Sequence, residues 1–199
     1  GLNWKADYVA VLDSKDKNLD LSGWVTLDNQ SGATYQNARL KLVAGDLNRV
    51  VEEYKARDAT GGRMELASKV AAAAAPFAEQ SFFEYHLYSL QRPTTIKNQQ
   101  TKQVSLLSAD RIPVSKRYIF TGSPQYFHSR YTGVMATQKV GVFVEIANKK
   151  DNNLGMPLPK GTLRVYKADG DGSLQFIGED RLDHTPKDEL IKIKMGDAF

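Results

Sequence analysis

Apolar and polar residues alternate with a period of two along several short stretches of the chain. In residues 18–29 the apolar or small side chains occupy every second position: Leu19, Leu21, Gly23, Val25 and Leu27. Successive side chains of a β-strand point to opposite faces of the sheet, so this stretch is expected to be a strand with one buried face. Residues 7–13 are also β-rich, and the charged run "SKDKN" between the two stretches provides a turn.

Strand-like stretches follow one another to the end of the chain. We expect further strands at residues 38–45, 81–90, 102–109, 116–122, 138–149, 162–168, 174–180 and 189–195. Pro113 separates two of them, and the pattern contains no alternation of strands with helices. Short strands separated by turn residues are typical of sandwiches and barrels. We therefore predict an all-β fold, an antiparallel β-sandwich of about ten short strands, with a barrel as the alternative.

Residues 47–80 interrupt this pattern. Residues 64–75 are strong helix formers, and Pro76 ends the run. Five consecutive alanines at 71–75 offer little apolar surface, so packing would hold such a helix weakly. We predict one β-sandwich domain over residues 1–199 that contains a short helical, Ala-rich excursion at 47–80.

The segment "GMPLPKG" is predicted to be a stiff connection. Pro157 and Pro159 fix an extended backbone and lack an N–H, which suits a sheet edge or a connection before a strand at Thr162. Gly155 and Gly161 permit bends on either side of the two prolines.

The composition is that of a folded protein rather than a disordered one. Of the 199 residues, 41% are hydrophobic and 25% are charged. The absence of cysteine excludes disulfides, thiolate metal sites and cysteine nucleophiles. No window approaches the ~20 apolar residues that span a bilayer. The first residues lack both the features of a signal peptide and an initiator Met, so the chain is predicted to be a processed product or a piece of a longer protein.

The formal charge of +4 arises from one region. Residues 81–138 contain seven basic and two acidic side chains, and nine of the nineteen aromatic residues. Within this region, the stretch "SPQYFHSRYTG" contains Tyr126, Phe127, His128, Arg130 and Tyr131. If exposed, such a cluster would stack on sugar rings or contact an anionic polymer; if buried, the rings would fill the core. Nucleic acid is not the expected ligand, because the charge excess is small and no recognised motif is present.

The glycine-rich stretch "KADGDGSLQFIGED" raises the question of a metal site. A calcium loop that starts at Asp169 would use Asp171, but Leu174 and Asp180 occupy the places of its glycine and glutamate. Asp-Gly steps between alternating apolar runs are a strong hairpin signal. We predict a structural turn, with Asp169 and Asp171 as weak metal candidates and no cofactor.

No catalytic residue is predicted. Glu179 and Asp180 are adjacent and would point to opposite faces of a strand. His86, His128 and His184 are far apart and match no metal-ligand spacing. The chain also contains neither a G-x-S-x-G turn nor a phosphate-binding loop.

Several stretches combine Trp, Gly, Asn and Pro at fixed places. They are "NWKADYVAVLD", "LDLSGWVTLDNQSGATYQNARLKLVAG", "FFEYHLYSLQRPTTIKNQQTKQVSLL" and the C-terminal stretch from "NKKDNNLGMPLPKG" to "GDAF". On these motifs the chain resembles, over nearly its whole length, the bacterial family known as domain of unknown function 4139. The resemblance implies a β-rich protein, often exported within a longer precursor, and some members carry mucoidy-inhibitor-like labels. Members generally continue beyond the position of "GDAF", so the resemblance also implies a fragment.

The favoured prediction of function is a non-catalytic interaction or assembly module of a periplasmic or secreted bacterial protein. Its partner would be a protein or a glycan at the cell envelope, and it would have no transmembrane segment. One alternative is a carbohydrate-binding module that uses the aromatic cluster around Tyr126. Another is a glycan-processing hydrolase, which requires two carboxylates facing one cleft.

Overall fold

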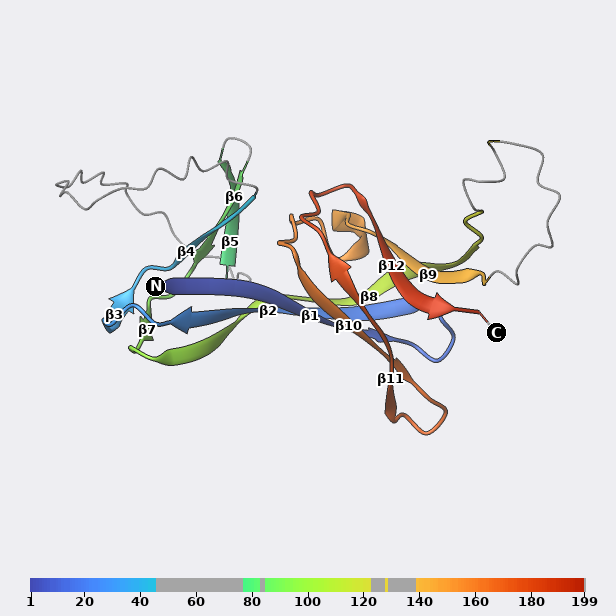
Figure 1. Ribbon diagram of the computed structural model, residues 1–199, viewed down its shortest axis with the longest axis horizontal. Helices are drawn as coiled ribbons and strands as arrows, with labels where there is room; N and C mark the ends of the chain where they lie inside the picture. Colours follow the sequence, from blue (N-terminus) through green and yellow to red (C-terminus); the bar gives the residue numbers. More distant parts are fainter. Residues whose placement is uncertain (46–76, 83–84, 123–127, 129–138, 199) are drawn as a thin grey trace.

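The computed structural model describes residues 1–45, 77–82, 85–122, 128 and 139–198. They form twelve strands and a one-turn 3-10 helix, η1 (Figure 1). The strands are β1 (Leu2–Leu12), β2 (Asn18–Asn29), β3 (Tyr35–Ala38), β4 (Lys41–Ala44), β5 (Phe77–Phe82), β6 (Tyr85–Leu90), β7 (Thr94–Ile96), β8 (Gln100–Ile119), β9 (Gly141–Ala147), β10 (Gly161–Ala168), β11 (Leu174–Leu182) and β12 (Leu190–Asp197), and η1 is Lys150–Asn152. The prediction of an all-β fold is confirmed. No helix in the described part of the chain is long and apolar enough to cross a bilayer.

The main sheet has seven strands in the order β11-β10-β1-β2-β8-β9-β12. Strand β1 pairs with β2 in antiparallel register but with β10 in parallel register, so the prediction of a purely antiparallel sheet is wrong at this pair. The two outer strands, β11 and β12, contact each other. The main sheet is therefore nearly closed on itself like a barrel, and it is not a clear sandwich of two layers.

A side-chain hydrogen bond joins the two outer strands. The backbone N–H of Lys194 on β12 donates to Oδ2 of Asp180 on β11 over 2.6 Å. At the neighbouring Gly178, a Cβ atom would lie only 3.1 Å from the carbonyl oxygen of Met195. Strands β11 and β12 thus approach each other closely here, and the Asp180 carboxylate accepts a backbone N–H of β12.

Strand β8 is one long strand where the sequence predicts two. Its first half pairs with β2 and its second half with β9, so the two strands predicted at 102–109 and 116–122 are one. Pro113 was expected to separate two strands. It instead lies within β8 opposite Asn18, and the N–H of the next residue, Val114, donates to the carbonyl of Lys17. Pro113 lies where the pairing of β8 with β2 ends and its pairing with β9 begins, so its missing N–H falls at the end of a ladder.

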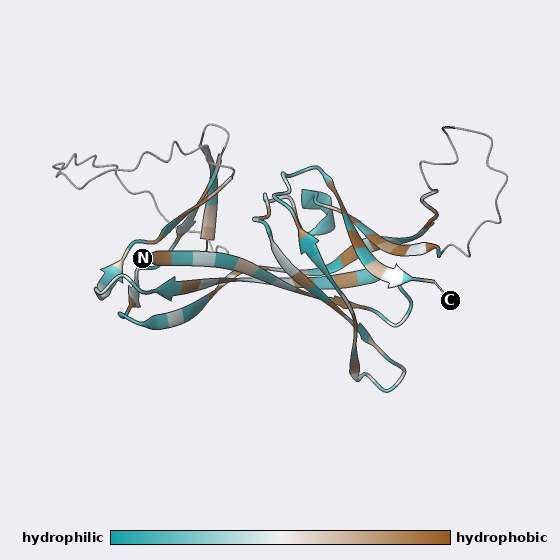
Figure 2. Ribbon diagram, viewed as in Figure 1, coloured by the Kyte–Doolittle hydropathy of each residue, from teal (hydrophilic) through white to brown (hydrophobic). Residues whose placement is uncertain are grey.

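Burial follows the predicted alternation. Along β2, alternate residues from Leu19 to Asn29 are buried, including every position predicted from the sequence. Figure 2 shows hydrophobic and hydrophilic residues alternating in bands along the long strands. Among the described residues, the largest fully buried side chains are Tyr8 on β1 and Tyr88 on β6. The long strands β1, β2 and β8 therefore carry much of the core.

Two smaller sheets lie at one end of the main sheet (Figure 1). Strands β4, β6 and β5 form one of them, and β3 and β7 form the other. Strand β5 includes residues 77–80, so the last four residues of the predicted Ala-rich excursion belong to a sheet. The rest of the excursion, including the predicted helix at 64–75, lies outside the described residues.

The connection that precedes β10 is buried. Pro157, Leu158 and Pro159 are all buried, and Leu158 exchanges two backbone hydrogen bonds with Thr185. The proline carbonyls are satisfied by two buried tyrosine hydroxyls. Tyr8 donates to the carbonyl of Pro159 over 2.7 Å, and Tyr88 on β6 donates to that of Pro157 over 2.8 Å. The predicted connection thus joins β1 of the main sheet to the small β4-β6-β5 sheet.

Asp16, in the turn between β1 and β2, links three parts of the main sheet. Its carboxylate accepts hydrogen bonds from Nζ of Lys167 on β10 (2.6 Å) and from Nζ of Lys116 on β8 (3.3 Å). Partial burial acts to raise the pKa of Asp16, but the hydrogen bonds from the two lysines outweigh it and hold the pKa below its usual value.

This depressed pKa predicts a loss of stability in acid. A carboxyl with a lower pKa in the folded than in the unfolded chain stabilises the fold above about pH 4 and loses that contribution as the pH falls further. Asp16→Asn is therefore expected to lower the free energy of unfolding at pH 7 and to flatten its decline below about pH 4. Urea unfolding across this pH range measures both effects, with Asp110→Asn at an exposed site as the control. Identical pH profiles for the two variants would contradict this role of Asp16.

Candidate functional site

The aromatic cluster predicted from the sequence lies almost entirely outside the described residues. Tyr126, Phe127, Arg130 and Tyr131 are in this group, whereas His128 is described and is exposed. The cluster as a ligand-binding surface stays a prediction.

The stretch around Asp169 and Asp171 forms the predicted hairpin turn between β10 and β11. Oδ1 of Asp169 accepts the N–H groups of Asp171 and Ser173, and Oδ1 of Asp171 also accepts the N–H of Ser173. Hydrogen bonding with the Asp169 carboxyl, followed by that from Ser173, lowers the pKa of Asp171 to about 2. Both carboxylates therefore stabilise the turn. The described residues contain no cluster of acidic and histidine side chains that could hold a metal.

Four of the other acids and histidines considered from the sequence have structural partners. Glu179 pairs with Arg164 on the neighbouring strand at 2.9 Å, and Asp180 accepts the backbone N–H of Lys194 on β12. His86 lies 2.8 Å from Glu79, and His184 accepts the backbone N–H of Lys160. Within the described residues, no pair of these carboxylates faces a common pocket.

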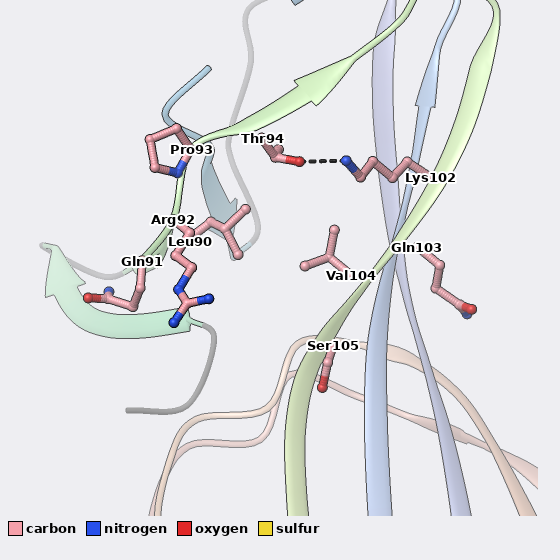
Figure 3. Close-up of a pocket in the computed structure, with 9 residues that line it drawn as sticks. All are labelled: Leu90, Gln91, Arg92, Pro93, Thr94, Lys102, Gln103, Val104 and Ser105. Carbon is pink, nitrogen blue, oxygen red and sulfur yellow. Dashed lines mark hydrogen bonds between the residues drawn. The ribbon is translucent and has the colours of Figure 1, made fainter. Parts of the chain in front are cut away.

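The largest described pocket is a groove of about 510 Å3 between the β6–β7 segment and the first half of β8 (Figure 3). We call it the β8 groove. It is lined by Leu90, Gln91, Arg92, Pro93, Thr94, Lys102, Gln103, Val104 and Ser105. Its volume falls within the roughly 300–1,000 Å3 typical of small-ligand sites.

The local sequence explains how the β8 groove forms. Strand β6 ends at Leu90, whose N–H donates to Leu40, and Pro93 then separates β6 from the short strand β7. On β8, alternation places Lys102 and Val104 on one side of the strand, and Figure 3 shows both pointing toward the β6–β7 segment. The two walls of the groove therefore come from segments that are consecutive in the chain.

Lys102 holds the two walls together. Its ammonium donates to Oγ1 of Thr94 over 2.6 Å and to the carbonyl of Thr95 over 3.1 Å. An ammonium has three N–H donors, and these bonds use two of them. Lys102 is therefore a structural cross-link that also places a positive charge at the groove.

The β8 groove has a cationic and hydrogen-bonding lining. Arg92 and Lys102 are positively charged, and none of the nine lining residues is acidic. Within the described residues, neither cation forms an ion pair. Gln91 and Thr94 add an amide and a hydroxyl group, whereas Figure 3 shows the side chain of Gln103 on the other side of β8. The remaining surface is largely apolar. This lining offers positive charge and hydrogen-bond donors to a polar or anionic ligand.

A second opening lies on the same face of the main sheet. Trp4, Leu27 and Lys102 are in register on β1, β2 and β8, so their side chains share a face. Leu27, in the middle, is buried, and Trp4 lines a pocket of about 280 Å3 together with Lys5. Lys5 is already paired with Asp7 at 3.2 Å. The β8 groove, with unpaired cations among the described residues, is therefore the stronger candidate.

Sequence reasoning identified the region of the groove but not the groove itself. The predicted basic excess at 81–138 includes Arg92 and Lys102. The aromatic cluster, rather than the "QRPTT" segment, is the functional centre that the sequence predicts for this region. The sequence signal for the groove is that Arg92 and Lys102 flank the stretch "PTTIKNQQT", which contains a proline and no acidic residue.

The chain matches no family model, no curated protein and no solved structure. The resemblance to the domain of unknown function 4139 family therefore stays a prediction.

Proposed function

We propose that this chain is a non-catalytic binding module of an exported bacterial protein, and that the β8 groove holds a saccharide of the cell envelope. The observation that carries the proposal is the lining of the groove, which presents cationic, amide and hydroxyl groups beside apolar side chains. Sugars offer many hydroxyls and an apolar C–H face, so binding sites for them combine these two kinds of surface. The export of the protein is proposed from the family resemblance alone.

The groove can be tested by filling it. Val104 is partly buried and points into the groove (Figure 3), so Val104→Trp is expected to weaken saccharide binding about 10-fold or more by occluding the site. Val114 is also a partly buried valine on β8 and lines none of the described pockets, so Val114→Trp is the matched control. A glycan array followed by calorimetry on the bound oligosaccharides measures the effect. Equal affinities for the two variants, or no bound glycan, would overturn the proposal.

A protein partner is the second candidate, and one observation favours it. Leu174 and Phe176 on the outer strand β11 are 54% and 57% exposed, which is unusual for large apolar side chains side by side on one strand. Phe176 packs edge-on against Tyr166 of β10, with the ring centres 5.6 Å apart. This arrangement suits an interaction or assembly role through the β10–β11 hairpin, and the absence of any bound glycan would favour it.

A further inference from the structure

We infer that the ligand of the β8 groove carries an anionic group, and that Arg92 is its principal contact. This inference rests on the proposed function and names its ligand class: an acidic saccharide, with a carboxylate, phosphate or sulfate substituent. The electrostatics of the groove, rather than its size, carry the inference.

The state of the Arg92 guanidinium is the first argument. Arg92 is exposed and no described residue provides it with an acidic partner. Figure 3 shows its guanidinium across the groove from Val104, pointing away from Pro93 and Thr94. A guanidinium presents N–H donors in a planar fork that matches the two oxygens of a carboxylate or phosphate. Arg92 is therefore placed and available to bind an anion.

Lys102 provides the second positive charge from the opposite wall. Its bonds to Thr94 and Thr95 fix the ammonium in one position, so little side-chain freedom would be lost when a ligand binds. No carboxyl group of the described residues lines the groove, so no negative charge in the lining repels an anion. Two cations in one lining favour an anionic ligand over a neutral one.

The apolar side chains of the groove argue for a saccharide that carries the anion rather than for a small free ion. Leu90, Pro93 and Val104 provide apolar surface beside the cations. A fully hydrated inorganic ion gains nothing from such surface, whereas the C–H face of a sugar ring does. The inferred ligand therefore joins an apolar face to a charged substituent.

Calorimetry with oligogalacturonate and with its neutral methyl ester tests the inference. The acidic form is expected to bind at least about 10-fold more tightly, because the ester keeps the shape of the sugar but removes the charge. Sulfated and phosphorylated oligosaccharides in parallel titrations distinguish a carboxylate from the other two anionic groups.

Arg92→Gln and Lys97→Gln form a matched pair of variants. Both residues are exposed and basic and lie in the same segment, but only Arg92 lines the groove. Arg92→Gln is expected to weaken binding of the acidic form about 10-fold or more, and Lys97→Gln to change it less than about 2-fold. Arg92→Lys should fall between them, because it keeps the charge and loses the fork.

The outcomes separate the inference from the proposed function. If neutral and acidic forms bind equally well and Val104→Trp abolishes both, the groove is a saccharide site but the inferred charge preference is wrong. If Arg92→Gln and Lys97→Gln have equal affinities, Arg92 is not the contact. Tighter binding of the acidic form that only Arg92→Gln removes would establish the inference.

Discussion

Gly161→Ala is expected to lower the free energy of unfolding by about 3 kcal/mol, the upper part of the range for overpacked sites. Gly161 begins β10 and lies opposite Ala6 in the parallel β1–β10 pair. A Cβ atom at position 161 would overlap the carbonyl oxygen of Ala6 and would lie 2.8 Å from its carbonyl carbon and 3.0 Å from a ring carbon of Tyr8. Backbone cannot move aside as a flexible side chain can, so the two strands must separate.

Gly170→Ala is the control for this prediction. Gly170 lies in the exposed β10–β11 turn, and a Cβ atom there would meet no atom within 4 Å. Its effect should stay within about 0.5 kcal/mol. Urea unfolding of the three proteins compares the midpoints and slopes. A midpoint for Gly161→Ala equal to that of Gly170→Ala would show that β1 and β10 do not approach as closely as described.

Asn148→Ala is expected to lower the free energy of unfolding by about 3 kcal/mol or more, because it leaves several buried polar groups without partners. Asn148 follows β9 and is fully buried. Its Nδ2 donates to the carbonyls of Met156 (2.9 Å) and Pro186 (2.8 Å), and its Oδ1 accepts the N–H of Gly155 (3.0 Å). The side chain therefore ties the buried connection before β10 to the turn before β12.

Two further variants distinguish these hydrogen bonds from a general effect of substitution. Asn148→Asp keeps the size of the side chain but turns an oxygen toward two carbonyl oxygens, so it should destabilise at least as much as alanine. Asn3 is exposed on β1, so Asn3→Ala should change the free energy of unfolding by less than about 0.5 kcal/mol. Thermal and urea unfolding measure all three. An Asn148→Asp variant as stable as the parent protein would contradict the assigned orientation of the amide.

The features that sequence reasoning predicted correctly depend on neighbouring residues. The buried face of β2 follows from alternation along one strand, and each side chain takes its face from the pleat. The hairpin turn at Asp169 follows from Asp-Gly steps between two such strands, and the structure shows its carboxylates bonded to the local backbone.

The predictions that were wrong or missing depend on pairs of residues far apart in the chain. Pro113 predicts a break when read locally, but it lies where β8 changes its partner from β2 to β9, so one strand continues through it. The "GMPLPKG" segment was correctly predicted as a connection, yet its burial depends on hydroxyl groups of Tyr8 and Tyr88, 151 and 69 residues away from their partners. No local pattern contains these partners.

The sequence by itself therefore determined the all-β class, the inward face of the strands and the turn chemistry, because periodicity and turn preferences act over a few residues. Only the tertiary structure decided that the sheet curls until β11 and β12 meet, that β1 pairs in parallel with β10, and that the β8 groove lies between β8 and the β6–β7 segment. These features depend on which strands pair and how strongly the sheet twists. Many pairings satisfy one alternating pattern, and packing of the whole core selects among them.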